Sequence, residues 1–292
     1  MNPTPKNIAA CSEALLRGEL VVVPTETVYG LAANALDSNA VQKIFAAKGR
    51  PEWNPVIVHV SGIDQAKEMV EWNDLATALA NAFWPGPLTL VLPDKGKVAK
   101  EILAGGTTLG VRCPNHSVFE TLLLNSQLPL AAPSANRFTQ LSPTRYEDID
   151  PEILKHCLGA LDGGPSDVGI ESTVVAINDN QITILRQGAV TQEQLSQFAP
   201  TIIAEKAAKN ASPGQHHRHY SPKNPVKLVE PGTSTDRTIR LTTDPKEYAQ
   251  QLYAKLAELD RTPGTINVER PPESPEWAAI WDRLRRAASD SP

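Results

Sequence analysis

The chain has 292 residues, 41% of them hydrophobic and 21% charged, which is ordinary for a globular protein of one large domain or of a large and a small one. Its net charge of −5 argues against stable nucleic-acid binding, and its three widely separated cysteines argue against a disulfide framework or a cysteine-based zinc site. No apolar stretch approaches the roughly 20 residues that cross a membrane, so we expect a cytoplasmic protein without membrane contact.

Up to about residue 195, short apolar strands alternate with amphipathic helices. A β-branched run predicts a strand over 19–24, and apolar residues on one face predict a helix over 38–51 that Ser38 can cap. Lys48 and Arg50 lie at the exit of this helix. Because later runs are apolar on both faces, we expect a mixed sheet flanked by helices on both sides. These further strands are predicted over 55–60, 88–92, 108–112, 129–133, 172–177 and 182–186.

The composition changes near residue 200. Residues 202–224 show little apolar periodicity and are therefore predicted to form a long linker. After it, residues 225–292 combine short strands with helices over 244–260 and 274–288, which predicts a second, smaller α/β domain of Rossmann-like type. So small a unit should rest on the larger domain, residues 1–201, for its stability.

Small polar side chains and isolated cations gather at the strand ends, where the crevice residues of α/β proteins collect. Neither a P-loop nor a G-x-G-x-x-G fingerprint is present. The clusters instead supply hydroxyls, amides and fixed positive charges, which suit an anionic ligand held without a dedicated loop. They occupy residues 24–30, 48–55, 110–114, 132–138 and 161–173.

Taken one at a time, these residues also have simpler interpretations. His59 inside a strand would ordinarily be a core histidine, and Lys48 and Arg50 would ordinarily be a solvated helix end. Ser134 and Asn136 could be turn formers. Pattern alone therefore indicates an enzyme for an anionic ligand and goes no further.

Seven strings in the first 191 residues, taken together, resemble the YrdC family in its long, two-domain form. They are "PTETVYGLAANA", "KGRPEWNPVIVHV", "FWPGPLTLVL", "GVRCPNH", "APSAN", "LDGGPSDVGIESTVV" and "ILRQGAVT", in the family's order, and "SPGQHHRHYSP" resembles its linker. The resemblance implies a YrdC-like twisted mixed sheet. It also implies an L-threonylcarbamoyladenylate synthase, a nucleotidyltransferase that makes threonylcarbamoyl-AMP and pyrophosphate from L-threonine, bicarbonate and ATP. A downstream threonylcarbamoyl transferase complex would then modify tRNA next to the anticodon.

The resemblance also implies roles for individual residues. The phosphate motif "KxR…SxN", expected to be catalytic, is Lys48, Arg50, Ser134 and Asn136. Positions expected to contact ATP are Arg50, Asn54, Thr108, Ala132, Ser134, Ser142 and Arg186, and positions expected to hold threonine are Thr27, His59, Arg112 and Ser172. Mg²⁺ is expected to arrive with the triphosphate, with no protein side chain as a metal ligand.

The linker motif at 212–222 allows three interpretations. A short histidine-rich tract can bind a metal, but the adjacent His216 and His217 point apart in any regular element. A plain tether is too unspecific an interpretation, because Arg218, His219 and Tyr220 match the signature of the family that the chain resembles. We therefore expect a lid that brings Tyr220 over ATP and excludes water from the adenylate.

Two other functions stay open at this point. A YrdC-like module could hold RNA without catalysis, although the acidic net charge speaks against it. An enzyme of carbamoyl adenylates with another acceptor would use similar motifs. Dependence of pyrophosphate release on threonine separates both from the synthase.

Overall fold

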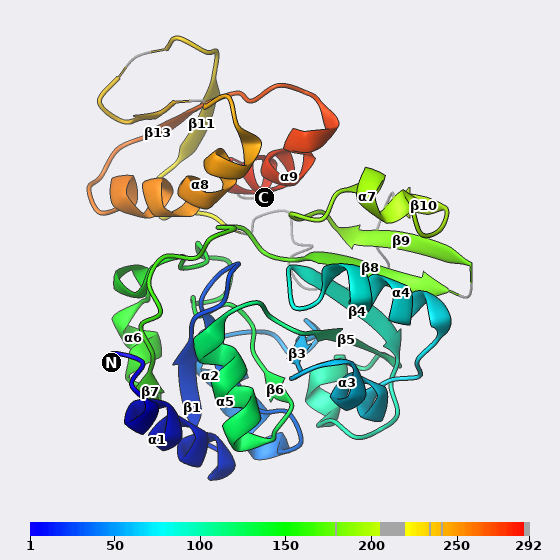
Figure 1. The fold of residues 1–292 in the computed structure, drawn as a ribbon. Helices are drawn as coiled ribbons and strands as arrows, with labels where there is room; N and C mark the ends of the chain where they lie inside the picture. The colour runs from blue at the N-terminus through cyan, green and yellow to red at the C-terminus, as the bar shows by residue number, and fades with distance from the viewer. Residues whose placement is uncertain (179, 205–219, 234, 241, 289–292) are drawn as a thin grey trace.

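The computed structural model describes residues 1–178, 180–204, 220–233, 235–240 and 242–288. Its large domain is built on ten strands: β1 (Leu20–Val23), β2 (Gly30–Asn34), β3 (Val58–His59), β4 (Leu88–Pro93), β5 (Thr108–Arg112), β6 (Leu130–Ala131), β7 (Cys157–Ala160), β8 (Thr173–Asn178), β9 (Gln181–Arg186) and β10 (Thr201–Ile203). They form one sheet in the order β10-β9-β8-β4-β5-β3-β6-β2-β1-β7 (Figure 1). β1 pairs antiparallel with β2 and parallel with β7, so the sheet is mixed, as predicted.

Helices cover both faces of this sheet. They are α1 (Pro5–Leu16), α2 (Ser38–Lys48), α3 (Ile63–Met69), α4 (Asp74–Phe83), α5 (Ser117–Ser126), α6 (Pro151–Leu154) and α7 (Gln192–Ser196), with 3₁₀ turns η1 (Lys100–Leu103) and η2 (Tyr146–Asp148). In β1, Val21 and Val23 pack into the apolar cluster that contains α1 and α5. Leu20 and Val22 face the other way, into the cluster that contains α2. No helix among the described residues is long and apolar enough to cross a membrane.

Both ends of α2 are fixed by capping residues, and Lys48 and Arg50 lie at its C-terminal end. Asp37, rather than the predicted Ser38, caps its start, because the Asp37 carboxylate accepts a hydrogen bond from the backbone amide of Asn39 at 2.9 Å. At its other end, Gly49 has a φ of 60°, a left-handed conformation that glycine adopts without steric cost. The chain therefore turns sharply between Lys48 and Arg50, and the two cations leave the helix in different directions.

The second unit has a three-stranded parallel sheet in the order β11-β13-β12. Its elements are β11 (Val226–Val229), β12 (Thr238–Ile239), α8 (Pro245–Asp260), β13 (Ile266–Glu269), a 3₁₀ turn η3 (Pro275–Trp277) and α9 (Ala278–Ala287). Asp244 caps α8 by accepting from the backbone amide of Lys246 at 2.9 Å. Parallel strands with helices against them confirm the small α/β fold.

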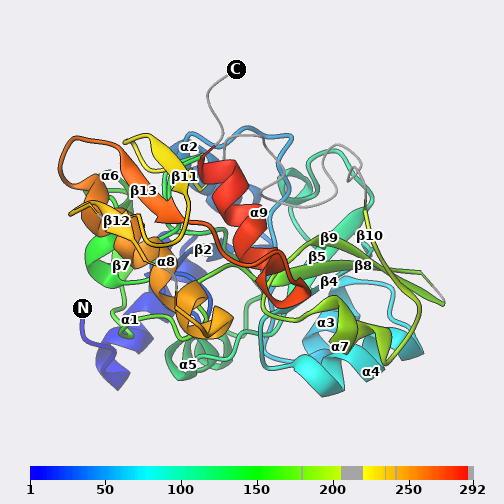
Figure 2. The ribbon, with the colours of Figure 1, turned by 90° about the horizontal axis from the view of Figure 1, so that it is seen from above.

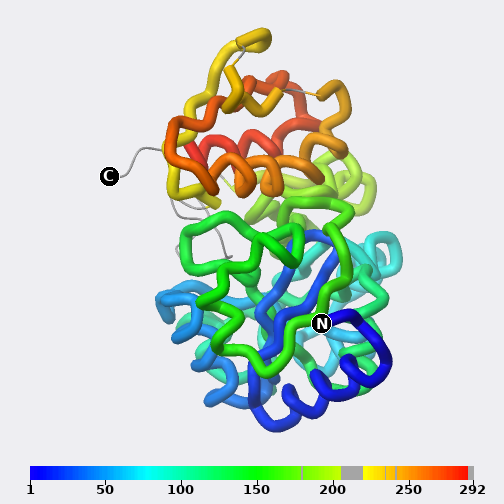
Figure 3. Tube along the Cα trace, turned by 90° about the vertical axis from the view of Figure 1, so that its left-hand side faces the viewer, coloured from blue at the N-terminus to red at the C-terminus, as the bar shows by residue number. Residues whose placement is uncertain are grey.

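The two units share apolar packing. Figure 3 shows the second unit stacked on the larger domain, and Figure 2 shows α8 and α9 lying over it. Val28 and Ile170 of the large domain belong to the same buried cluster as Leu252, Trp277 and other residues of the second unit. The larger domain thus completes the small core, which is the support that a unit of this size needs.

The large sheet continues through β10, which pairs parallel with β9. Residues 202 and 203, expected at the start of the linker, therefore belong to a strand. Residues 205–219, which make up most of the expected linker and include His216 and His217, lie outside the described residues.

Candidate active site

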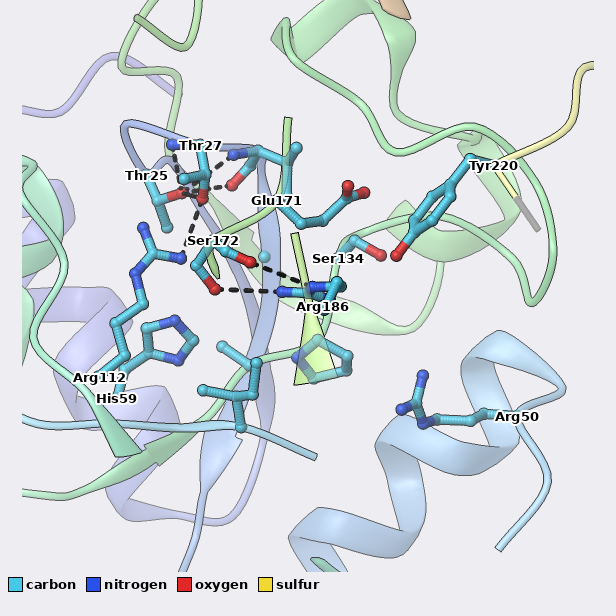
Figure 4. Close-up of a pocket in the computed structure, with 15 residues that line it drawn as sticks. Thr25, Thr27, Arg50, His59, Arg112, Ser134, Glu171, Ser172, Arg186 and Tyr220 are labelled. Carbon is cyan, nitrogen blue, oxygen red and sulfur yellow. Dashed lines mark hydrogen bonds between the residues drawn. The ribbon is translucent and has the colours of Figure 1, made fainter. Parts of the chain in front are cut away.

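A pocket lies where the loop after β1, the exit of α2, the ends of β3 and β5 and the loop after β6 come together (Figure 4). Arg112 and His59 lie side by side at one side of it, and Arg50 points toward it from the opposite side. Many residues that are far apart in the sequence meet here. Of the predicted site residues, those that line the pocket are Thr27, Arg50, His59, Arg112, Ala132, Ser134, Ser172, Arg186 and Tyr220.

The Arg112 guanidinium is buried and held by three partners. Its Nη2 lies 2.7 Å from the Glu26 Oε1 carboxylate oxygen, and its Nη1 donates to the Thr27 hydroxyl at 3.0 Å. Its Nε donates to the Gly86 carbonyl at 3.2 Å. Two of the five N–H donors of the guanidinium are used in these hydrogen bonds, and Nη2 pairs with Glu26 by charge without a hydrogen-bond partner among the described residues, so the fixed cation retains donors for an anionic group in the pocket.

His59 lies next to Arg112 because β3 and β5 pair with these two residues in register. Burial lowers the pKa of His59 well below its ordinary value, and the charge of Arg112 lowers it further, so the imidazole is neutral near pH 7. Its Nδ1 has no hydrogen-bond partner among the described residues. A buried polar atom without a partner at a pocket wall indicates a place for a ligand group.

Ser172 joins the two sides of the pocket. Its hydroxyl shares a hydrogen bond of 2.8 Å with the Thr89 hydroxyl and accepts one of 3.1 Å from Arg186 Nη2. Arg186 Nε also donates to the Ser172 carbonyl at 3.1 Å. The Ser172 side chain is therefore fixed by two neighbours, one of which supplies a positive charge.

Arg50 is anchored by the loop that follows it. Its Nε donates to the Asn54 carbonyl at 3.2 Å, and its Nη2 donates to the Asn54 Oδ1 at 2.8 Å. Burial lowers the pKa of Arg50 to about 9, so the side chain is still a cation at neutral pH. Asn54, expected to contact ATP, does not line the pocket itself and accepts hydrogen bonds from the Arg50 guanidinium that does.

The Lys48 side chain contacts the loop that carries Ser134 and does not line the pocket. Its buried Nζ donates to the backbone carbonyls of Ser134 and Asn136. Burial lowers the pKa of Lys48 well below its ordinary value, and the charge of Arg50 adds to this effect. The two halves of the "KxR…SxN" motif are thus joined by hydrogen bonds from the Lys48 side chain to backbone carbonyls.

Four other predicted residues lie off the pocket wall, like Asn54. They are Lys48, Asn136, Ser142 and Thr108. The Asn136 amide donates to the carbonyls of Arg137 and Gln140, at 2.7 and 2.9 Å. Ser142 is buried and donates to the Glu171 carboxylate at 2.6 Å. Thr108 is exposed, at the opposite end of β5 from Arg112.

Several residues of the site were not predicted, and three of them carry polar groups that contact predicted residues: Glu26, Glu171 and Thr89. Glu26 and Glu171 stand inside the quoted strings "PTETVYG" and "GIEST", so their position beside predicted residues was the available signal. Thr89 stands in an apolar strand, and its polarity there was the only sign of a role. All three contact a predicted residue directly: Glu26 contacts Arg112, Glu171 contacts Ser142 and Thr89 contacts Ser172.

Metal binding by protein side chains has no support in the described part of the chain. No three His, Cys, Asp or Glu side chains gather there in a way that could hold a metal ion.

Comparison with known proteins covers nearly all of the chain. A family model described as "Telomere recombination" (Sua5, YciO and YrdC) matches residues 13–188, and one described as "Threonylcarbamoyl-AMP synthase, C-terminal domain" matches residues 190–289. The threonylcarbamoyl-AMP synthase of Bacillus subtilis is 40% identical over 230 residues, which span 76% of this chain and 66% of that protein. The synthase of Pyrococcus abyssi is 34% identical over 308 residues, or 93% of this chain and 91% of that protein.

Solved structures of the P. abyssi protein are similar to this chain over nearly its full length. P. abyssi Sua5 complexed with L-threonine matches with a TM-score of 0.86 and 34% identity, over 96% of this chain and 94% of that one. A P. abyssi Sua5 variant with an adjacent histidine and tyrosine replaced by alanine matches with a TM-score of 0.88 and 33% identity, over 96% and 92%.

Proposed function

The chain belongs to the Sua5–YciO–YrdC family, and from this premise we propose that it makes threonylcarbamoyl-AMP and pyrophosphate from L-threonine, bicarbonate and ATP. The observation that carries the proposal is the pocket itself. It places a fixed cation, Arg112, with a neutral His59 at one side and a second cation, Arg50, at the other. This arrangement of side chains suits a small amino acid on the side of Arg112 and a polyanion on the side of Arg50.

Threonine fits the Arg112 side. Its carboxylate would take up the donors of Arg112 that Glu26 and Thr27 do not use. The unpartnered Nδ1 of His59 can hydrogen-bond the threonine hydroxyl or the carbamate. Thr27 and Ser172 add hydroxyls on the same wall.

ATP fits the side that holds Arg50, Ser134 and Arg186. The amine of threonine and bicarbonate first form a carbamate with loss of water. A carbamate oxygen then attacks the α-phosphorus of ATP, and pyrophosphate leaves with the electron pair of the broken P–O bond. Both reactants are anionic, so the residues contribute by alignment and by neutralising charge rather than by acid–base chemistry. Arg50 and Arg186 supply that charge from rigid positions, since each is held by hydrogen bonds to its surroundings.

Mg²⁺ would enter bound to the triphosphate and neutralise part of its charge. Glu171 is the carboxylate of the pocket wall, and both of its oxygens already accept hydrogen bonds, so it is not poised as a ligand. The product would be consumed in the cytoplasm by a separate threonylcarbamoyl transferase complex that modifies tRNA. No stable contact of this chain with nucleic acid is needed for that step.

The domain division and the lid over ATP are part of the proposal, with the first boundary moved from 201 to 203 because β10 extends to Ile203, so that the parts are 1–203, 204–224 and 225–292. Tyr220 supports the lid, since it lines the pocket from the end of the linker. Its ring stacks on Tyr253 at 6.0 Å between ring centroids, with Arg283 5.0 Å from its centroid. The variant of the P. abyssi protein concerns an adjacent histidine and tyrosine, and such a pair occurs in this sequence at 219 and 220.

Mass spectrometry of a reaction with ATP, bicarbonate and single amino acids tests the proposal. We expect threonylcarbamoyl-AMP and pyrophosphate only when threonine and bicarbonate are both present. Pyrophosphate release without threonine would contradict the proposal and would favour a carbamoyl-adenylate enzyme with another acceptor. Absence of any ATP turnover would favour a binding module.

A further inference from the structure

Arg283 reaches from the second unit into the wall of the pocket. It lies on α9, and it is among the most deeply buried side chains of the described residues, with 1% of its surface exposed. Its Nε lies 2.8 Å from the Glu171 Oε2, and its Nη1 donates to the Gln187 carbonyl at 2.9 Å. Nη1 also lies 2.7 Å from the carboxylate of Asp282, its own neighbour. One arginine thus bridges α9 and the segment 171–187 of the large domain.

Glu171 is enclosed by partners from both units. Its Oε1 accepts from the Ser142 hydroxyl at 2.6 Å, on the large-domain side. Its Oε2 accepts from Arg283 and from the Tyr253 hydroxyl, at 2.8 and 3.1 Å, both in the second unit. Ser142 and the neighbouring Arg186 are positions expected to contact ATP, so this carboxylate stands inside the nucleotide side of the pocket.

A carboxylate in that position needs a counter-charge. Burial raises the pKa of Glu171, but the charges of Arg283 and Arg186, together with the hydrogen bonds from Ser142 and Arg283, lower the pKa below its ordinary value. Glu171 is therefore ionised, and its negative charge faces the space proposed for a triphosphate. Arg283 does not line the pocket, and it neutralises the charge of Glu171 from the side of the second unit. Arg50 and Arg186, which do line the pocket, are left to act on the phosphates.

We propose that Arg283 is a positioning residue for ATP binding, which acts through Glu171 and makes the nucleotide side of the pocket depend on the docked second unit. The inference rests on the proposed use of ATP. Arg283 cancels the charge of Glu171 and fixes its carboxylate against Ser142. Loss of Arg283 leaves an uncompensated negative charge next to the triphosphate.

Three variants test this in the full-length chain: Arg283→Met, Glu171→Gln and the double variant. Each single change breaks the same buried pair, so both should lower the melting temperature. Their effects on the KM for ATP should differ in size. For Arg283→Met we expect the KM for ATP to rise by about tenfold or more, as removal of one partner of a buried charge pair implies, with little change in the KM for threonine. For Glu171→Gln, which removes the repelling charge but alters a residue of the pocket wall, we expect a clearly smaller rise than for Arg283→Met.

In the double variant neither charge remains, so most of the ATP affinity should return. Arg261→Met is the matched control, because Arg261 also forms an ion pair between the units, with Asp148 at 3.1 Å, and neither residue lines the pocket. We expect its KM for ATP to stay within about twofold of the wild type, because neither partner of this ion pair lines the pocket. Arg283→Lys keeps the charge and should keep most of the affinity if Arg283→Met does not fold.

The outcomes separate the inference from the function. Equal rises in the KM for ATP for Glu171→Gln and Arg283→Met would show that the pair only holds the fold together, and so would an equal rise for Arg261→Met. Failure of the double variant to recover, or a loss in Arg283→Lys as large as in Arg283→Met, would also overturn the inference. Failure of the wild type to bind or consume ATP would instead overturn the proposed function.

Discussion

Lys48 offers a test of how the "KxR…SxN" motif works. Replacing it by Met keeps the length of the side chain but removes the Nζ that donates to the carbonyls of Ser134 and Asn136. Each buried carbonyl left without a donor costs about 1–3 kcal/mol, or about 2–6 kcal/mol for two. Met does not have to leave water as an ammonium does, so part of that cost is recovered, and we expect the free energy of unfolding to fall by about 2–4 kcal/mol.

Urea denaturation followed by circular dichroism measures this loss, and ATP kinetics measure its consequence. Because the loop at 134–136 loses its anchor, kcat/KM for ATP should fall together with stability. Gln42→Met is the control on the same helix, since Gln42 is exposed and its amide donates to the Glu101 carboxylate at 3.2 Å. It should change the stability by less than about 1 kcal/mol. A Lys48→Met variant with unchanged stability but lost ATP affinity would refute loop anchoring and indicate direct contact with phosphate.

Three further predictions address the pocket. Arg50→Ala should lower kcat/KM for ATP by an amount equivalent to about 2–4 kcal/mol of transition-state stabilisation, and an unchanged kcat/KM would contradict its role. Serine should be a poorer substrate than threonine and valine poorer still, because valine leaves the polar groups around His59 unpaired; equal turnover of valine and threonine would be inconsistent with this pocket. His59 binds a proton more weakly in the folded than in the unfolded state, so the free energy of unfolding of the wild type should fall as pH falls below 6.5, by up to about 1.4 kcal/mol per pH unit. In urea titrations at pH 6.5 and 5, His59→Gln should lose correspondingly less. Parallel losses in the two proteins would count against a buried neutral His59.

Much of the fold follows from local patterns in the sequence. The β-branched run before Pro24 forms β1, and the amphipathic face after Ser38 forms α2, because hydrophobic periodicity and backbone preferences act over a few residues. Asp244 caps α8 for the same local reason. The cap of α2 was assigned one residue late, to Ser38 instead of Asp37, since two adjacent residues with capping side chains compete at that point.

The pocket was predicted as a set of strand-end clusters, and strand ends do come together in a sheet. The motif strings identified the residue types, so Arg112, His59 and Ser172 were named before their contacts were known. Their partners were not: a strand pattern shows that Thr89 is in β4, but not that its hydroxyl lies 2.8 Å from that of Ser172.

The sequence by itself determined the elements, the order of the motifs and the chemistry available, because each depends on neighbouring residues. Only the tertiary structure decided where the long side chains of Lys48 and Arg283 end. Lys48 turns behind the loop at 134–136, and Arg283 crosses between the units to Glu171, 112 positions earlier in the chain. Such contacts arise from how the sheet orders its strands and how α9 packs on the large domain, and no local preference encodes them.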